Sequence, residues 1–300
     1  MVVPNYNHSP YLRQRIDSIL NQTYQNFEII ILDDCSTDNS KEIIESFRNN
    51  AKMSHVIYSQ KNSGSTFKQW EKGIELAKGK YIWIAESDDV ASLNFLNLLV
   101  LELEKHDDVA LIYSASTIKE NDFVESELHD GNSVRHCGKS FIKNRMLFNP
   151  EIINSSAVLF NSSMIDELLL GEIIKYKLAG DWLFWNYLAS KGDVIEVKDR
   201  LNFFRQHSAN TSRKINSEYT FINEGFKVLL FTSKFLNIKP EFVHLKVWAS
   251  IWAQFQLSKM QVFFVNFKTA CSISLYLPFG FVFYYLKFKY LTKKNIKIAK

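Results

Sequence analysis

Short runs of β-branched residues alternate with segments of helical periodicity over the first 115 residues, and this alternation constrains the fold more than any other feature. It is typical of βαβ units, in which crossover helices cover a largely parallel sheet. We therefore expect an α/β fold with a doubly wound, mostly parallel sheet. The expected strands are residues 2–4, 27–32, 54–59, 81–85 and 109–113, and the expected helices are residues 11–20, 41–49, 67–77 and 93–105.

The sequence becomes less regular beyond residue 115. Residues 122–139 are polar and rich in Asp, Glu, His, Gly and Ser, so we expect a loop or flap at the sheet edge. After residue 215 the chain becomes rich in aromatic residues and lysine at near-helical spacing. We therefore predict a main α/β domain of residues 1–215 and a helical, aromatic and basic appendage of residues 216–300. Further elements expected in the domain are strands at residues 156–160, 194–197 and 201–204 and a helix at residues 181–190.

Charge is unevenly distributed along the chain, although the net charge is only +4. Residues 1–220 hold 24 Lys and Arg against 30 Asp and Glu, whereas residues 221–300 hold 12 Lys against Glu224 and Glu241. Because the main domain is acidic and only the tail is basic, we expect no nucleic-acid partner. A basic, aromatic tail favours contact with anionic lipid or another polyanion.

The tail also contains residues 269–286, which carry no charge and precede six lysines between Lys287 and Lys300. This segment is short for a bilayer span, which needs about 20 residues, and Pro278 and Gly280 interrupt it. We favour an interfacial helix pair with a lysine fringe, because aromatic and basic residues together suit the headgroup region. Packing of the aromatic side chains against the main domain is the alternative.

Cysteine usage and the N-terminus indicate the compartment. Cys35, Cys137 and Cys271 lie far apart and show no metal-binding or redox spacing, which fits free thiols in a reducing environment. The N-terminus has no charged segment followed by a long apolar run, so we expect no secretory signal. We therefore expect a cytoplasmic protein that is peripheral on the inner face of the cell membrane.

Carboxylates follow two of the expected strands at the point where each strand ends. Asp33 and Asp34 follow residues 27–32, and Glu86, Asp88 and Asp89 follow residues 81–85. Ligands of parallel α/β sheets bind beyond the carboxyl ends of the strands. Adjacent carboxylates repel one another unless a cation compensates, and Mg²⁺ or Mn²⁺ prefers oxygen ligands. The alternative interpretation is that these acids only cap helices or build a turn.

Two further candidate features lie at the start of expected helices. Residues 62–66 lead into an expected helix, so their backbone N–H groups are suited to bind an anionic ligand, and Lys68 or Lys72 could reach a phosphate of that ligand. An ordinary loop with solvated lysines fits equally well. Asp181 opens the later helix, where an Asp is more commonly a helix cap than a catalytic group.

Several ordered motifs within residues 1–210 carry a resemblance to a known family. They are PNYN at residues 4–7, SILNQTY at residues 18–24, LDDCSTD at residues 32–38, AKGKYI at residues 77–82 and ESDD at residues 86–89. Together they resemble the family 2 inverting glycosyltransferases, which have the GT-A fold. The resemblance implies that residues 1–215 bind a nucleotide diphosphate sugar donor and transfer the sugar to an acceptor hydroxyl. It also implies Mn²⁺ or Mg²⁺ as cofactor, a glycan or lipid-linked acceptor, and synthesis of a bacterial-type surface polysaccharide or glycolipid.

The same resemblance assigns the nucleotide-binding residues. It implies that Pro4 and Tyr6 line the nucleotide pocket, that Asp34 contacts the base and that Asp33 supports the same turn.

An acidic pair and a general base also follow from the resemblance. Asp88 and Asp89 correspond to the metal-and-ribose pair, and Glu86 stands where the first Asp of a D-x-D motif is common. We predict Asp89 as the direct metal ligand and Asp88 as a ribose or metal contact. Asp181 takes the position of the base that accepts the proton of the acceptor hydroxyl during inversion. Trp182 is then expected to provide an apolar wall for a sugar ring.

A late basic segment completes the resemblance. Arg205 and His207 are similar to the residues that close over the diphosphate in this family. A strand end with exposed charge is the alternative interpretation.

Three other functions compete with this interpretation. A haloacid-dehalogenase-like phosphatase also follows an apolar strand with Asp, but it needs a second Asp two positions later, where this chain has Cys35 or Ser36. A nucleotidyltransferase commonly opens with a Gly-rich basic loop instead of PNYN. A non-catalytic module that binds a nucleotide sugar or glycan is the third, and only activity that depends on Asp181 separates it from an enzyme.

Overall fold

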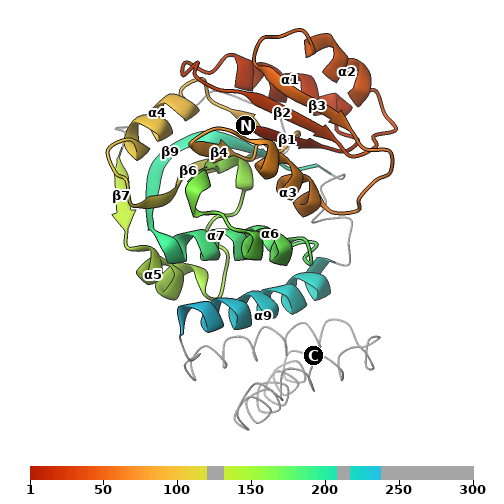
Figure 1. Ribbon diagram of the computed structural model, residues 1–300. Coiled ribbons are helices and arrows are strands. Elements are labelled where there is room, and N and C mark those ends of the chain that lie inside the picture. Colours follow the sequence, from red (N-terminus) through yellow and green to blue (C-terminus); the bar gives the residue numbers. More distant parts are fainter. Residues whose placement is uncertain (120–131, 208–216, 238–300) are drawn as a thin grey trace, which may run out of the picture. The chain divides into compact units, whose positions relative to one another are not determined.

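The computed structural model describes residues 1–119, 132–207 and 217–237 (Figure 1). Contacts divide the chain into two compact units, one of residues 1–146 and 150–210 and the other of residues 147–149 and 211–300. Within the second unit, the described helix is α9 (Ser217–Leu236). The predicted boundary at residue 215 and the predictions for the tail beyond residue 237 lie outside the described residues. None of the described helices is both long enough and apolar enough to cross a membrane.

A three-stranded parallel sheet in the order β1-β2-β3 begins the first unit. Val3 and Ile31 belong to the core cluster that also contains Ile16 of the first helix, whereas Val2 on the opposite face contacts Gly73 of the third helix. Helices therefore cover both faces of this sheet, as the doubly wound prediction requires (Figure 1). The elements are β1 (Val2–Asn5), α1 (Ser9–Leu20), β2 (Ile29–Asp33), α2 (Ser40–Phe47), β3 (Met53–Tyr58) and α3 (Thr66–Leu76).

A mixed sheet forms the rest of the first unit, in the order β4-β8-β6-β9-β5 with β7 paired to β9. β6 and β9 run parallel, while β8 is antiparallel to β4 and β6. A hydrogen bond of 2.8 Å from Ala85 N to Val2 O joins the end of β4 to β1. The expected α/β fold is confirmed, with antiparallel strands added beside the parallel core. These strands are β4 (Tyr81–Trp83), β5 (Val90–Ala91), β6 (Val109–Lys119), β7 (Ser133–His136), β8 (Val158–Asn161) and β9 (Asp193–Arg205).

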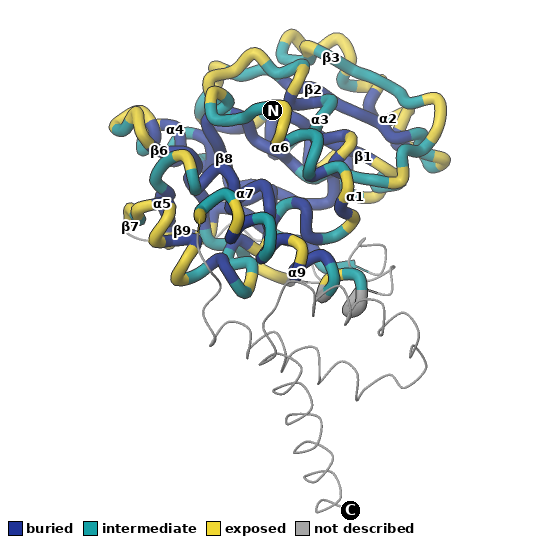
Figure 2. The backbone as a smooth tube through the Cα atoms, turned by 60° about the horizontal axis from the view of Figure 1, so that its bottom comes forward, coloured by how far each residue is buried: buried dark blue, intermediate teal, exposed yellow. Residues whose placement is uncertain are grey.

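Helices of residues 95–191 lie around the mixed sheet. Buried residues occur along the strands of this sheet and in the helices beside it (Figure 2). A buried aromatic cluster joins α3 to a helix of this half: the Trp70 ring centroid lies 5.8 Å from that of Phe184 and 5.9 Å from that of Trp185. The helical elements are α4 (Phe95–Leu103), α5 (Gly138–Phe141), the π-helix η1 (Ile142–Met146), the 3₁₀ turns η2 (Ser155–Ala157) and η3 (Ser162–Met164), α6 (Glu167–Ile173) and α7 (Gly180–Lys191).

One predicted element is wrong where the structure describes it, and two predicted strands are joined into one. Within residues 132–139 of the predicted loop, residues 133–136 are the strand β7 and residues 138–139 begin α5. β7 pairs antiparallel with β9, and Arg135 on β7 forms ion pairs with Asp108 and Asp193. Residues 122–131 of that predicted loop lie outside the described residues. The two strands expected at residues 194–197 and 201–204 are one continuous strand, β9, because register shifts against β6 near Ser114–Ser116 accommodate its polar residues 198–200.

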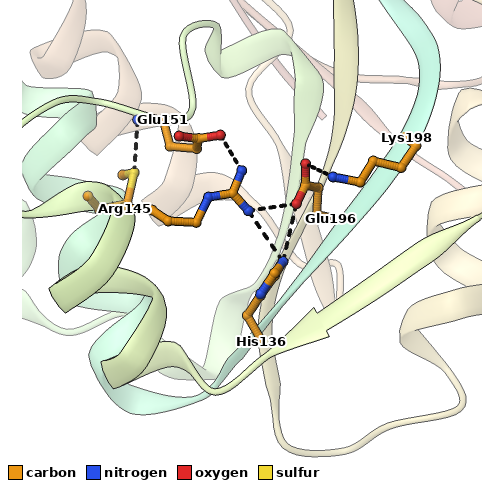
Figure 3. Close-up of polar contacts among 6 residues, drawn as sticks. His136, Arg145, Glu151, Glu196 and Lys198 are labelled. Carbon is orange, nitrogen blue, oxygen red and sulfur yellow. Dashed lines mark hydrogen bonds and ion pairs between the residues drawn. The ribbon is translucent and has the colours of Figure 1, made fainter.

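A network of charged side chains fastens β7 and η1 to β9 (Figure 3). Glu196 on β9 accepts hydrogen bonds from Arg145 Nη1 at 2.7 Å and Lys198 Nζ at 2.5 Å, and it lies 3.2 Å from His136 Nε2. Arg145 also pairs with Glu151. Partial burial raises the pKa of Glu196, but the hydrogen bonds from Arg145, Lys198 and His136 outweigh it and bring the pKa down to about 2.

Candidate active site

The residues that follow β1, β2 and β4 lie at one edge of the fold. Asn5 at the end of β1 pairs with Asp33 at the end of β2. Ile84, just after β4, bridges Val2 at the start of β1, and the chain continues in parallel until Ser87 Oγ lies 2.8 Å from His8 Nδ1, beyond the end of β1. The residues that follow these three strands therefore converge, as expected for parallel strands. Convergence at this edge brings the LDDC and ESDD motifs together.

Asp33 builds the turn after β2. Its carboxylate accepts hydrogen bonds from Asn5 Nδ2 at 2.7 Å, from Ser36 Oγ at 2.6 Å and from Ser36 N at 2.9 Å. Cys35 within this turn adopts a left-handed conformation with φ of 64°. Because Asp33 is buried and its oxygens accept from these donors, it holds the turn after β2 in its conformation.

Asp34 points to the loop before α3. Its two carboxylate oxygens accept hydrogen bonds from Ser63 N at 3.0 Å each, from Ser63 Oγ at 2.8 Å and from Gln69 Nε2 at 2.8 Å. The carboxylate thereby ties the end of β2 to α3. Gln69, which the sequence did not single out, holds Asp34 from the first turn of that helix.

The other residues predicted for nucleotide binding lie around this turn at different depths. Pro4 is buried within β1, whereas Tyr6 just beyond the strand is 45% exposed. Lys68 is exposed on the first turn of α3, and Lys72 is half-buried one turn later. Tyr6 and Lys68 are thus accessible to a ligand, and their predicted contacts with the nucleotide sugar stay predictions.

Asp88 lies in a cluster with two histidines that come from distant parts of the chain. His207 Nε2, beyond β9, is 3.0 Å from Asp88 Oδ2, and His8 Nδ1, before α1, is 2.8 Å from Ser87 Oγ. One ligand atom from each of His8, Asp88 and His207 lies within 4.8 Å of the others. Burial raises the pKa of Asp88, but the hydrogen bond from His207 and the charge of His8 bring it below its ordinary value. This geometry can hold a divalent cation.

Asp89 faces into the protein and is engaged by protein groups. Its Oδ2 accepts hydrogen bonds from Asn154 Nδ2 at 2.9 Å and Ser156 Oγ at 2.6 Å, and its Oδ1 accepts one from Arg205 N at 3.0 Å. Burial and the negative charge of Asp88 raise the pKa of Asp89 to about 6. Asp89 thus anchors the end of β9 and the turn η2 beside the site. The prediction that it binds the metal directly stays a prediction, but this geometry favours Asp88.

Glu86 is the third acid of this segment and is half-buried. Its Oε1 accepts a hydrogen bond of 2.9 Å from Trp70 Nε1, and its backbone N–H donates to Ser156 Oγ at 3.0 Å. Burial, together with the negative charges of Asp88 and Asp89, raises the pKa of Glu86 to about 8. Repulsion among three acids is the condition that a bound cation relieves.

Arg205 contacts the backbone of the ESDD segment. Its Nε donates to Asp88 O at 2.9 Å and its Nη2 to Gln14 Oε1 at 2.5 Å, while its guanidinium lies 4.9 Å from the Tyr11 ring centroid. The side chain is buried. Its geometry is that of a positioning residue, and contact with a diphosphate stays a prediction.

Asp181 lies in the first turn of α7, where its Oδ1 accepts a hydrogen bond of 2.7 Å from Trp182 N. A Cβ on Gly180 would lie 2.7 Å from the Phe67 ring, so α7 begins in tight contact with α3. Trp182 does not form the expected wall for a sugar, because it is 1% exposed and its Nε1 donates to Met146 O at 2.6 Å. Asp181 itself is half-buried.

Comparison with known proteins identifies the family. The model described as glycosyl transferase family 2 matches residues 1–169, which is more than half of the chain. The chain belongs to glycosyltransferase family 2. Its curated relatives include glycosyltransferase GlyG of Streptococcus pneumoniae, which is 32% identical over 71% of this chain and 72% of GlyG. Another relative is the poly(ribitol-phosphate) beta-N-acetylglucosaminyltransferase TarS of Staphylococcus aureus, 32% identical over 37% of this chain and 20% of TarS.

Solved structures share the fold of this glycosyltransferase. S. aureus TarS in complex with UDP-GlcNAc superposes with a TM-score of 0.61, at 18% identity, over 85% of this chain and 70% of that one. The mannosyltransferase PcManGT of Pyrobaculum calidifontis, in complex with GDP-Man and Mn²⁺, superposes with a TM-score of 0.52 at 14% identity, over 99% and 85% of the two chains. These likenesses confirm the GT-A fold.

Several residues of the site had no role in the sequence analysis. The clearest are His8, Gln69, Trp70, Asn154 and Ser156, because each contacts or adjoins one of the site acids. His8 carried a signal, since it follows the PNYN motif directly before a helix. The other four look like ordinary helix, loop or strand residues until the fold brings them to the acids.

Proposed function

We propose that this glycosyltransferase is a metal-dependent, inverting enzyme that uses a pyrimidine nucleoside diphosphate sugar as donor. The observation that carries the proposal is the cluster of His8, Asp88 and His207 beside the turn that holds Asp34. A cation site next to a nucleotide pocket at the strand ends is the arrangement that a diphosphate donor requires.

The donor set of the cluster fits a transition-metal cation. Two imidazoles and one carboxylate suit Mn²⁺ better than Mg²⁺, which prefers all-oxygen coordination. When bound, the cation supplies electrostatic stabilisation of the leaving diphosphate. In this proposal Asp88, His207 and His8 are the ligands, while Asp89 and Arg205 hold the ESDD segment in place.

The choice of a pyrimidine base rests on a structural neighbour, because TarS is solved in complex with UDP-GlcNAc. The two oxygens of Asp34 already accept four hydrogen bonds, two from Ser63 N, one from Ser63 Oγ and one from Gln69 Nε2. In this proposal Asp34 therefore holds the loop before α3 beside the base.

Asp181 is the proposed general base. The acceptor oxygen attacks the anomeric carbon of the donor sugar, the carboxylate of Asp181 takes the hydroxyl proton, and the bond from that carbon to the diphosphate oxygen breaks. Attack from the face opposite the leaving group inverts the anomeric configuration. The contact of Gly180 with Phe67 holds the start of α7 in place for this task.

We further propose a glycan or lipid-linked acceptor and a role in cell-surface polysaccharide synthesis. The name of TarS, a transferase acting on poly(ribitol-phosphate), supports a surface polymer as acceptor. Donors of this kind are made in the cytoplasm, so we place the enzyme there. Contact of its basic tail with the inner membrane surface is part of the proposal and rests on the sequence alone.

Donor hydrolysis and transfer across a panel of UDP-, dTDP- and GDP-sugars with Mn²⁺ test the proposal. We expect one pyrimidine donor to be consumed, Asp88→Asn to lose Mn²⁺-dependent turnover, and Asp181→Asn to bind donor without turning it over. Asp107→Asn, an exposed carboxylate on the surface, is the matched control and should behave as wild type. Donor binding without turnover in the wild type would favour a binding module. Release of pyrophosphate from a nucleoside triphosphate added with a sugar phosphate would favour a nucleotidyltransferase.

A further inference from the structure

Arg15 on α1 is a fully buried cation within an apolar helix face. It is 0% exposed, as are Leu12, Ile16 and Ile19 on the same helix. Its guanidinium carbon lies 4.7 Å from the ring centroid of Trp83. Among the described residues, no acceptor pairs with its Nε, Nη1 or Nη2. Burying a charge with unmet donors is costly, so the fold must compensate Arg15 in another way.

The acidic segment of the site supplies that compensation. Burial lowers the pKa of Arg15 to about 10, while the negative charges of Asp89, Asp88 and Glu86 oppose this shift. The Trp83 ring, which contacts the guanidinium, donates a hydrogen bond from Nε1 to the carbonyl oxygen of Ser156. The hydroxyl of Ser156 in turn donates to Asp89. Arg15 therefore lies in the layer directly behind the acids, on their protein side.

Other residues on the same side of α1 also contact the site. Tyr11 lies against His207 with ring centroids 4.6 Å apart, and Gln14 accepts the hydrogen bond from Arg205. Residues 11, 14 and 15 follow the three- and four-residue spacing of one helix face. Tyr11 of α1 thus lies against a residue of the cation cluster, and the buried Arg15 lies one turn further along the helix.

We propose that Arg15 is the internal counter-cation of the acidic site and weakens the binding of a divalent cation by the free enzyme. Like charges repel across the weakly screened interior, so a fixed positive charge behind the ligands opposes an incoming Mn²⁺. The diphosphate of the donor adds negative charge on the open side and restores affinity. The cation therefore binds tightly only together with the donor. This inference rests on the cation site of the proposed function.

Mn²⁺ titration by calorimetry, with and without UDP, tests the inference on the full chain. We expect Arg15→Met to bind Mn²⁺ about tenfold more tightly than wild type without UDP, and the enhancement by UDP to shrink accordingly. Arg15→Lys keeps the charge and should match wild type within about threefold. Arg15→Gln serves as a second neutral variant where Arg15→Met does not fold. A merely structural role of Arg15 would change Mn²⁺ binding in Arg15→Lys as well as in the neutral variants, because all of them lose the guanidinium.

The outcomes separate this inference from the cation site itself. Unchanged or weaker Mn²⁺ binding by a folded neutral variant overturns the role of Arg15, while Asp88-dependent binding in the wild type leaves the cation site intact. If the wild type binds no Mn²⁺ even with UDP, both the site and the inference fail. Tighter binding in Arg15→Lys as well would also overturn the inference, because it would make the shape of the side chain, and not its charge, the cause.

Discussion

Replacement of Asp89 by alanine tests which of the adjacent acids is structural. The substitution leaves three buried donors without an acceptor, namely Asn154 Nδ2, Ser156 Oγ and Arg205 N. Each unmet buried donor costs about 1–3 kcal/mol. Removal of a buried charge offsets part of this loss, so we expect the free energy of unfolding to fall by about 2–5 kcal/mol. Asp88→Ala loses one partly accessible contact with His207 and should cost about 1 kcal/mol.

Urea unfolding in the presence of EDTA, followed by circular dichroism, measures these differences without any contribution from a bound cation. Mn²⁺ titration of the same variants gives the second comparison, in which Asp88→Ala should lose binding. Ser156→Ala removes one of the three donors and should show a smaller loss, about 1–2 kcal/mol. Near wild-type stability of Asp89→Ala with loss of Mn²⁺ binding, while Asp88→Ala still binds, would refute this reasoning and restore Asp89 as the direct ligand.

Three other predictions concern stability. Gly138→Ala should lower the free energy of unfolding by about 3 kcal/mol or more, measured in urea, because its Cβ would lie 1.9 Å from the carbonyl oxygen of Ala189. Cys35→Gly should raise it by about 1 kcal/mol, because glycine adopts a φ of 64° without strain. Glu196→Gln should destabilise the protein above pH 4.5. Its pKa is about 2 in the folded state, so its ion pair with Arg145 stabilises fully above the unfolded pKa and is lost as the pH falls from about 4.5 to 2.

One matched control and two contrary outcomes test these predictions. Gly171→Ala controls for Gly138: no atom lies within 4 Å of the added Cβ, so this change inside α6 should raise the free energy of unfolding by about 0.5–1 kcal/mol. A loss of stability in Cys35→Gly would show that the thiol contributes more than the strain costs. The difference in melting temperature between wild type and Glu196→Gln should be constant above about pH 4.5 and should shrink as the pH falls towards 2, and a constant difference across that window would contradict the assigned pKa.

The parallel core and the strand-end acids were predictable because both are local in sequence. Hydrophobic periodicity reports which residues of one segment face inward, and the direction of parallel strands places LDDC and ESDD at one edge. Asp33 and Asp34 were therefore expected at the turn after β2, and the structure finds them there. Motif resemblance added the family, which the match over residues 1–169 confirms.

Tertiary structure decided which neighbouring side chain faces which way. Asp88 and Asp89 are adjacent in sequence, yet Asp88 meets His207 and Asp89 turns to η2 and the end of β9. The strand β7 could not be predicted from the sequence, because its residues are polar and form a strand by pairing with β9, which is distant in sequence. Arg15 interrupts an apolar helix face, a local irregularity whose meaning depends on acids more than 70 positions away. The local hydrophobic pattern determines where a strand or helix lies in the sequence. Long-range packing determines the orientation and the charge environment of each side chain, and these determine the chemistry of the site.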